Sequence, residues 1–138
     1  MVARAPSAQG RALLVLYHYG LVGFDEALGP AVRLGDVQNS PRQVEVVAAS
    51  EAALAAELAR GSLVALEYAS AQRLGLAPAR DALAMEDGFS PFAQVLTVRR
   101  ADLAAQPAWL TRLSSAYRSA AVKDFILRHF QDSVRRAW

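Results

Sequence analysis

Short apolar runs alternate with segments of helical spacing along this chain. Residues 1–5 and 44–48 are short and apolar, and the β-branched composition of 44–48 is typical of a strand. The run at 63–66 lies between Gly61 and Glu67 and predicts a fully buried parallel strand. Residues 92–98 follow a turn-rich stretch and predict a further, stronger strand.

Signals for helix start and helix stop lie between these runs. Ser7 stands at the predicted N-cap of an apolar helix that continues to residue 19, where Gly20 is expected to end it. Ser50 is expected to cap a helix over residues 51–60, with Gly61 as its stop. The remaining predicted helices cover residues 68–74, closed by Gly75, residues 107–117, with Pro107 in the first turn, and residues 119–130, capped by Ser119.

The segments between these elements have the composition of connections. Residues 21–41 are rich in glycine and proline and predict a loop with at most one short helical turn. Residues 77–81 predict a second connection, and residues 83–86 are weakly extended. Strands that alternate with helices predict an α/β fold with a largely parallel sheet. The boundary is expected near residues 77–85, because a differently ordered strand and two helices follow it.

Composition and charge narrow the class of protein. Hydrophobic residues make up 54% of the 138 residues and charged residues 20%, which suits a folded domain with a core. No apolar run approaches the roughly 18–20 residues that span a bilayer. The net charge is +2, and the arginines are spread from Arg4 to Arg136 among acidic residues. A nucleic-acid binder concentrates its cations on one face, so we predict no nucleic-acid partner.

Most catalytic and cofactor-binding signatures are absent from the sequence. It contains no glycine-rich dinucleotide or phosphate-binding motif, no paired-histidine zinc motif and no nucleophile-elbow serine. Cysteine is absent, which excludes thiolate metal sites and a lipid-anchoring cysteine within these residues. His18 and His129 are interpreted as ordinary helix positions, and Glu86 with Asp87 as part of a solvated loop. We therefore predict no enzyme activity, no cofactor and no metal site.

Arg11 is a candidate ligand-binding residue because of its place in the predicted order of strand and helix. It is expected in the first turn of a helix that follows a strand, directly after small residues. Free backbone N–H groups at a helix N-terminus favour anions, and a guanidinium grips a carboxylate through two parallel hydrogen bonds. In α/β sheets, ligands gather at the carboxyl ends of strands. An anion site and an ordinary exposed arginine are both consistent with this spacing.

Several stretches together resemble the NlpA-type methionine-binding lipoproteins, the substrate-binding components of methionine ABC importers. Residues 10–16 and 20–22 are similar to the family's "GRALLLL…GLI" segment, and residues 75–83 to its "GL.PAKDAL". Residues 86–95 resemble its "ED..SPYAN" strand. Further similarity lies in Asp36 to Val47, in residues 119–126 and in the final Ala137 and Trp138.

This resemblance implies a type II periplasmic-binding-protein fold, in which two α/β lobes close on an amino acid. Residues 1–76 would form one nearly complete lobe, residues 77–85 the hinge connection, and residues 86–138 a strand and two helices returning towards the other lobe. The family's first lobe, signal peptide and lipobox cysteine would precede Met1 and are expected to be missing from this chain. In the full-length family the protein is periplasmic and lipid-anchored.

The resemblance implies ligand-contacting positions, and only some of them carry the family's residue in this chain. Arg11 is kept as the residue for the ligand carboxylate. Glu67 and Gln94 each stand where the relatives carry an asparagine. A glutamate adds a negative charge and accepts hydrogen bonds only, so Glu67 is expected either to alter ligand preference or to pair with a nearby arginine such as Arg11.

The resemblance therefore predicts capture of a methionine-like amino acid, with the membrane subunits of an ABC importer as partners and an altered specificity. The alternative is a single-lobe α/β protein with an enzymatic or regulatory role. A lone lobe exposes the face that its partner should cover, so that alternative predicts a homo-oligomer if the first lobe is truly absent.

Overall fold

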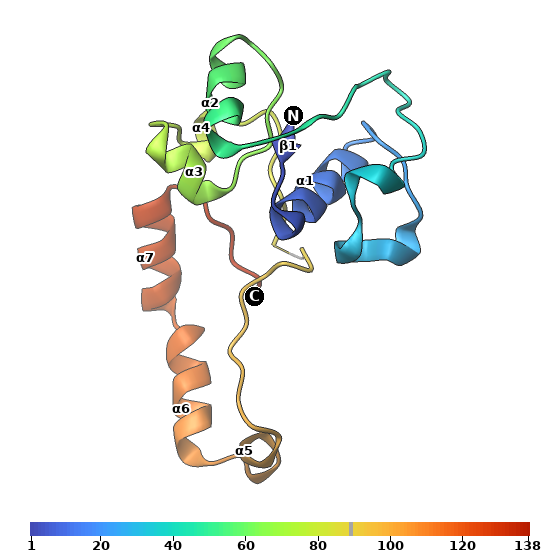
Figure 1. The fold of residues 1–138 in the computed structure, drawn as a ribbon. Coiled ribbons are helices and arrows are strands. Elements are labelled where there is room, and N and C mark those ends of the chain that lie inside the picture. The colour runs from blue at the N-terminus through green and yellow to red at the C-terminus, as the bar shows by residue number, and fades with distance from the viewer. Residues whose placement is uncertain (89) are drawn as a thin grey trace. The chain divides into compact units, whose positions relative to one another are not determined.

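The computed structural model describes residues 1–88 and 90–138, and the chain forms two compact units. The first unit comprises Met1–Glu86 and the second Asp87–Trp138 (Figure 1). Each unit is described by itself below.

A small parallel sheet stands at the centre of the first unit. Strand β1 (Val2–Ala3) pairs with β2 (Ala48–Ala49), with Val2 opposite Ala48. Helix α1 (Pro6–His18) follows β1 directly. A strand followed at once by a helix is the start of a βαβ unit. The parallel pairing of β1 with β2 confirms the first predicted strand and the parallel sheet. The second strand was predicted at residues 44–48 and forms at Ala48–Ala49 instead.

The predicted buried strand at residues 63–66 is wrong in two respects. These residues are not in a strand, although the Ala65 N–H donates to the Met1 carbonyl at 2.9 Å beside β1. The Leu63 side chain is 47% exposed, so the run is not fully buried either. The Met1 amino group also donates to the Leu63 carbonyl, so the run lies alongside the residue that precedes β1 without itself being in a strand.

The core of the first unit forms where α1 packs on the segment that follows it. Leu13, Val22, Phe24 and Val32 make one buried cluster, and the Tyr17 ring lies 4.7 Å from the Phe24 ring, centroid to centroid. Gly10 permits this close packing, because a Cβ at that position would lie 2.7 Å from the Pro30 carbonyl oxygen. This segment contains two 3-10 helices, Glu26–Ala31 and Leu34–Asp36, where at most one turn was expected.

Three helices of the first unit end in the same way. Helix α1, helix α2 (Glu51–Ala59) and helix α3 (Tyr68–Arg73) are each followed by a glycine with positive φ one residue beyond the C-cap. These are Gly20, Gly61 and Gly75, as the sequence predicted. After each, two backbone hydrogen bonds return to the last turn; in α3 they run from Gly75 to Gln72 and from Leu76 to Ala71. This is the Schellman motif, which satisfies carbonyls at the helix end.

Helix starts agree with the sequence in part. Ser50 caps α2 by accepting a hydrogen bond from the Ala53 N–H, as predicted. Helix α1 begins at Pro6, not after Ser7, because proline suits the first helical position. The connection predicted at residues 77–81 contains a short helix, α4 (Pro78–Asp81).

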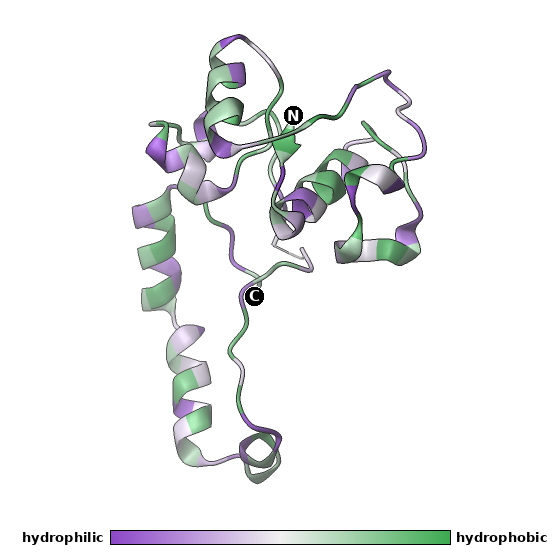
Figure 2. Cartoon of the chain, viewed as in Figure 1, coloured by the Kyte–Doolittle hydropathy of each residue, from purple (hydrophilic) through white to green (hydrophobic). Residues whose placement is uncertain are grey.

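The second unit consists of three helices and a long extended segment. Helices α5 (Arg100–Ala105), α6 (Ala108–Tyr117) and α7 (Ala120–Phe130) have no buried residue. Ser119 caps α7 as predicted, α5 was missed, and Pro107 is the N-cap of α6 instead of part of its first turn. Figure 2 shows hydrophobic and hydrophilic residues interleaved along α6 and α7.

The strong strand predicted at residues 92–98 does not form. No residue of that stretch is in a strand, and Val95 is 79% exposed. Among its described residues the second unit holds no strand with which this segment could pair. The β-branched and aromatic residues that favour a strand are present, but a hydrogen-bonding neighbour is not found among the described residues of this unit.

Candidate ligand-binding site

Arg11 lies in α1, close to where the chain leaves β1. Because α1 begins at Pro6, Arg11 is in the second helical turn, whereas the sequence predicted the first. The turn before it contains the small residues Ser7, Ala8 and Gly10. Arg11 therefore lies beyond the first-turn N–H groups that the sequence analysis expected it to join.

The guanidinium of Arg11 is held by Glu86. Arg11 Nε donates to Glu86 Oε2 at 2.5 Å, and Nη2 forms an ion pair with the same oxygen. The side chains are 43% and 20% exposed, respectively. Interpreting Glu86 as part of a solvated loop is thus wrong. No local signal could have found this pair, because 75 positions separate the two residues.

A second contact fixes the segment that carries Glu86. The Tyr19 hydroxyl, one residue beyond the end of α1, donates to the Met85 carbonyl at 3.3 Å. Met85 and Glu86 are therefore both attached to the α1 region, Met85 just beyond its end through Tyr19 and Glu86 in its second turn through Arg11. The last residues of the first unit have a defined place beside Arg11.

Glu67 stands at the N-cap of α3, directly after residues 63–66. Its side chain is exposed and makes no capping hydrogen bond. Within residues 1–88 and 90–138 its carboxylate has no ion-pair partner, so the expected pairing with Arg11 is corrected: Arg11 pairs with Glu86. Gln94 lies in the extended, exposed segment of the second unit. The structure brings Arg11 together with Glu86, a residue that was not among the predicted site residues.

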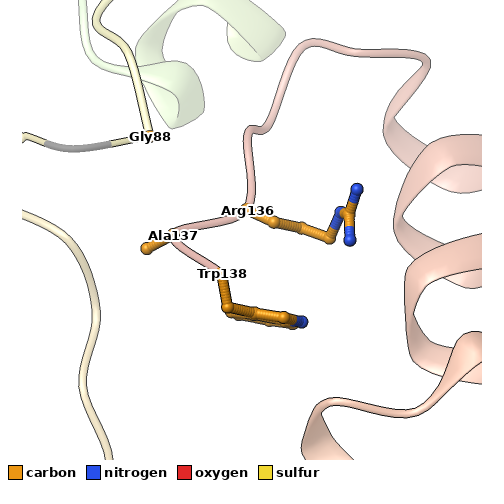
Figure 3. Close-up of a pocket in the computed structure, with 4 residues that line it drawn as sticks. All are labelled: Gly88, Arg136, Ala137 and Trp138. Atoms are coloured by element: carbon orange, nitrogen blue, oxygen red, sulfur yellow. The ribbon is translucent and has the colours of Figure 1, made fainter.

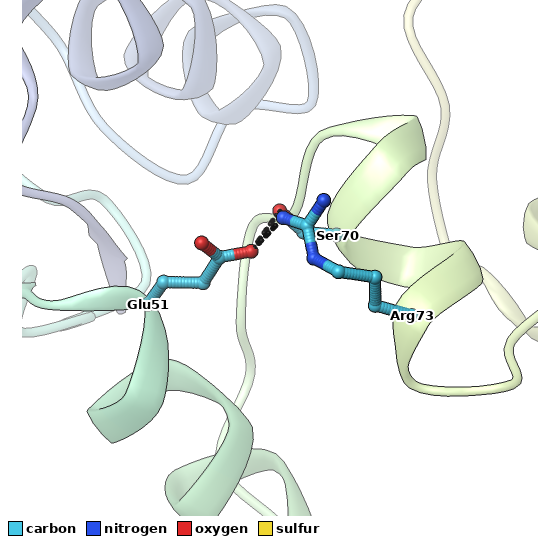
Figure 4. A network of polar contacts seen from close by, with 3 residues as sticks. All are labelled: Glu51, Ser70 and Arg73. Carbon is cyan, nitrogen blue, oxygen red and sulfur yellow. Dashed lines mark hydrogen bonds and ion pairs between the residues drawn. The ribbon is translucent and has the colours of Figure 1, made fainter.

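A polar network ties the helix that follows Glu67 to its neighbour. The Ser70 hydroxyl of α3 donates to Glu51 Oε1 at 2.6 Å, and Arg73 forms an ion pair with the same oxygen (Figure 4). The hydrogen bond from Ser70, followed by that from Arg73, lowers the pKa of Glu51 below its ordinary value. The first turn of α2 is thereby joined to α3, which fixes the helix that begins after Glu67.

A small hollow in the second unit is a poor match for a ligand. It measures about 100 Å³ and is lined by Gly88, Arg136, Ala137 and Trp138 (Figure 3). Sites for small molecules usually measure about 300–1,000 Å³. Gly88 is required there by close backbone approach, because a Cβ would lie 2.3 Å from the Arg136 carbonyl oxygen. The hollow is better explained by packing than by binding.

Two further features of the described residues bear on function. They contain no group of three or more histidine, cysteine, aspartate or glutamate side chains that could hold a metal ion. None of their helices combines the length and the apolar character needed to cross a membrane.

Solved structures define the class of protein. A nutrient-binding protein from Burkholderia cenocepacia bound to methionine is 28% identical, with a TM-score of 0.71 over 99% of this chain and 57% of its own. A periplasmic substrate-binding protein of an ABC transporter from Coxiella burnetii is 32% identical, with a TM-score of 0.69 over 96% of this chain and 55% of its own. The fold is thus that of a periplasmic binding protein, of which this chain covers part.

The sequence comparisons give the family. The profile described as NlpA lipoprotein matches residues 1–138, and the chain belongs to this family. The probable D-methionine-binding lipoprotein MetQ of Vibrio cholerae is 26% identical over 137 residues, which are 99% of this chain and 50% of that protein. MetQ of Escherichia coli K12 is also 26% identical, over 99% of this chain and 51% of that protein. The chain spans about half the length of these relatives, and the predicted family and fold class are confirmed.

Proposed function

We propose that this chain is part of the substrate-binding component of an ABC importer and captures methionine or a methionine-like amino acid. The observation that carries the proposal is the family match over all 138 residues. The likeness to a protein bound to methionine supports the ligand class. Capture requires no bond to be made or broken, so the proposal assigns no catalytic residue.

In this proposal residues 1–76 form one lobe, residues 77–85 the hinge connection, and residues 86–138 return towards the other lobe. Arg11 binds the ligand carboxylate, since a guanidinium forms two parallel hydrogen bonds with that group. Glu67 and Gln94 contact the ligand at positions where the family has asparagine. The relatives are named as lipoproteins, which supports a periplasmic, lipid-anchored place and the membrane subunits of an importer as partners.

The first test is calorimetry with the 138-residue chain. We expect no L-methionine binding at micromolar or tighter affinity, because one lobe encloses too little of a small ligand and pockets bury most of a ligand's surface. A micromolar dissociation constant would contradict this expectation.

The decisive test joins the chain to the half of Vibrio cholerae MetQ that it does not match. This assembled protein is expected to bind D- or L-methionine, and Arg11→Gln is expected to weaken binding at least tenfold, since a charged hydrogen bond contributes about 1.5–3 kcal/mol. If the assembled protein folds but binds neither D- nor L-methionine, the proposed function is disproved.

A further inference from the structure

We propose that Glu86 is a positioning residue that orients the Arg11 guanidinium for the carboxylate of the ligand. The inference rests on the proposed function and assigns a role to a residue that makes no ligand contact itself. It starts from the geometry of the ion pair: Arg11 Nε and Nη2 both reach the same oxygen, Glu86 Oε2. A guanidinium held along that edge has its plane fixed.

The difference in exposure indicates which partner supports the other. The Glu86 side chain is 20% exposed, whereas that of Arg11 is 43% exposed. The carboxylate is therefore the more enclosed partner, and an anion that arrives from solvent meets the guanidinium first. A glutamate that merely occupied the ligand's place would be expected on the exposed side.

The backbone of Glu86 is anchored independently of the ion pair. The Tyr19 hydroxyl donates to the carbonyl of Met85, the residue before Glu86. The carboxylate is thus presented from a fixed segment. An arginine side chain loses much rotamer freedom when it binds a ligand, and fixing it beforehand raises affinity by removing part of that cost.

The first arm of the experiment tests the pair in the 138-residue chain by NMR of the arginine Nε–H groups. The Arg11 signal is expected to exchange slowly with water in the wild type, and about tenfold faster in Glu86→Gln, because the charge-assisted hydrogen bond is weakened. The matched control is Glu57→Gln, which removes the same charge from the Glu57–Arg60 pair on α2 and should leave the Arg11 signal unchanged. Equal Arg11 exchange rates in all three proteins overturn the inference.

The second arm measures ligand affinity in the protein assembled with the unmatched half of MetQ. Glu86→Gln is expected to raise the Kd for methionine about fivefold, the effect of about 1 kcal/mol for a partly exposed pair. The Kd for methioninol, which lacks the carboxylate, should not change. In the Arg11→Gln background, Glu86→Gln should have no further effect, since its role is exerted through Arg11.

The outcomes separate the two proposals. A Glu86→Gln protein that binds methionine equally well or more tightly, or that loses methionine and methioninol alike, overturns the positioning role and leaves the proposed function standing. If neither the wild type nor Glu86→Gln binds methionine, the proposed function fails and the role of Glu86 fails with it.

Discussion

At the scale of single residues, the two charged residues proposed to contact the ligand differ in their ion pairing. Arg11 is neutralised by Glu86, whereas the carboxylate of Glu67 is exposed at the start of α3 without an ion-pair partner among the described residues. A charge without a partner affects a nearby ligand directly. Glu67 is therefore the position at which a change of ligand preference is most readily tested.

We expect Glu67→Asn to tighten methionine binding in the assembled protein about fivefold. Under the proposed function, the substitution introduces the neutral asparagine that the family resemblance implies at this position and removes a negative charge that would repel the ligand carboxylate. At about 4 Å that repulsion is worth about 1 kcal/mol in water, the value suited to an exposed group. Titration calorimetry measures the effect, with Glu45→Asn as a control for the loss of an exposed carboxylate. An unchanged affinity for methionine would show that Glu67 does not contact the ligand.

Glu51 makes the stability of the first unit depend on pH. Its pKa is lowered in the folded chain by Ser70 and Arg73, so its contribution is present above the unfolded pKa and is lost as the pH falls through the folded pKa. We expect the unfolding free energy of the wild type to fall more steeply between about pH 5 and pH 3 than that of Glu51→Gln. Chemical denaturation across this range measures both slopes, and parallel curves would contradict the prediction.

Arg11 and Glu86 differ in how far sequence could reveal them. The strand–helix order and the small residues before Arg11 point to it, although they predict a place in the first helical turn and the structure places it in the second. Glu86 acquires its role only because folding brings it to Arg11 across 75 positions. Local spacing carries no information about such a pair.

At the scale of elements, helix ends were predictable because their signals are local. Ser50 and Ser119 cap helices through their own neighbours, and the glycines after α1, α2 and α3 supply a backbone conformation that other residues avoid. Strands were less predictable, because a strand depends on a partner elsewhere in the chain. Residues 92–98, of which none is in a strand, illustrate this limit.

Gly75→Ala is expected to lower the free energy of unfolding by about 1 kcal/mol. Gly75 has φ of +73°, a conformation in which an L-residue with a Cβ is strained. The control is Gly35→Ala, since Gly35 has no positive φ and no atom lies within 4 Å of the place that an alanine methyl would take. Urea denaturation of both variants gives the comparison, and equal losses would show that backbone conformation is not the cause.

At the scale of the whole chain, the buried apolar side chains of the described residues all belong to the first unit. They are Val2, Ala12, Leu13, Val22, Phe24, Val32, Ala49, Leu54 and Ala71. The helices of the second unit bury no residue. Because burial of apolar surface is the main source of stability, the two units are expected to differ strongly in stability.

Hydrogen exchange should reveal this difference in the 138-residue chain. Amides in the middle of α1 are expected to exchange at least a hundredfold more slowly than those of α6 and α7, since local opening costs little where nothing is buried. Exchange followed by mass spectrometry measures each helix separately. Similar protection in α1 and α7 would show that the second unit is stabilised by contacts that its own residues do not provide.

The three glycines that end α1, α2 and α3 have a consequence for chirality. Each holds a φ between +66° and +87°, which lies in the region that the mirror-image amino acids prefer. At Gly20, Gly61 and Gly75 the backbone thus follows the handedness of a D-residue inside a chain of L-residues. Chemical synthesis with D-alanine at these points would restrict the unfolded chain while keeping the native turn, a stabilisation that no genetically encoded side chain supplies.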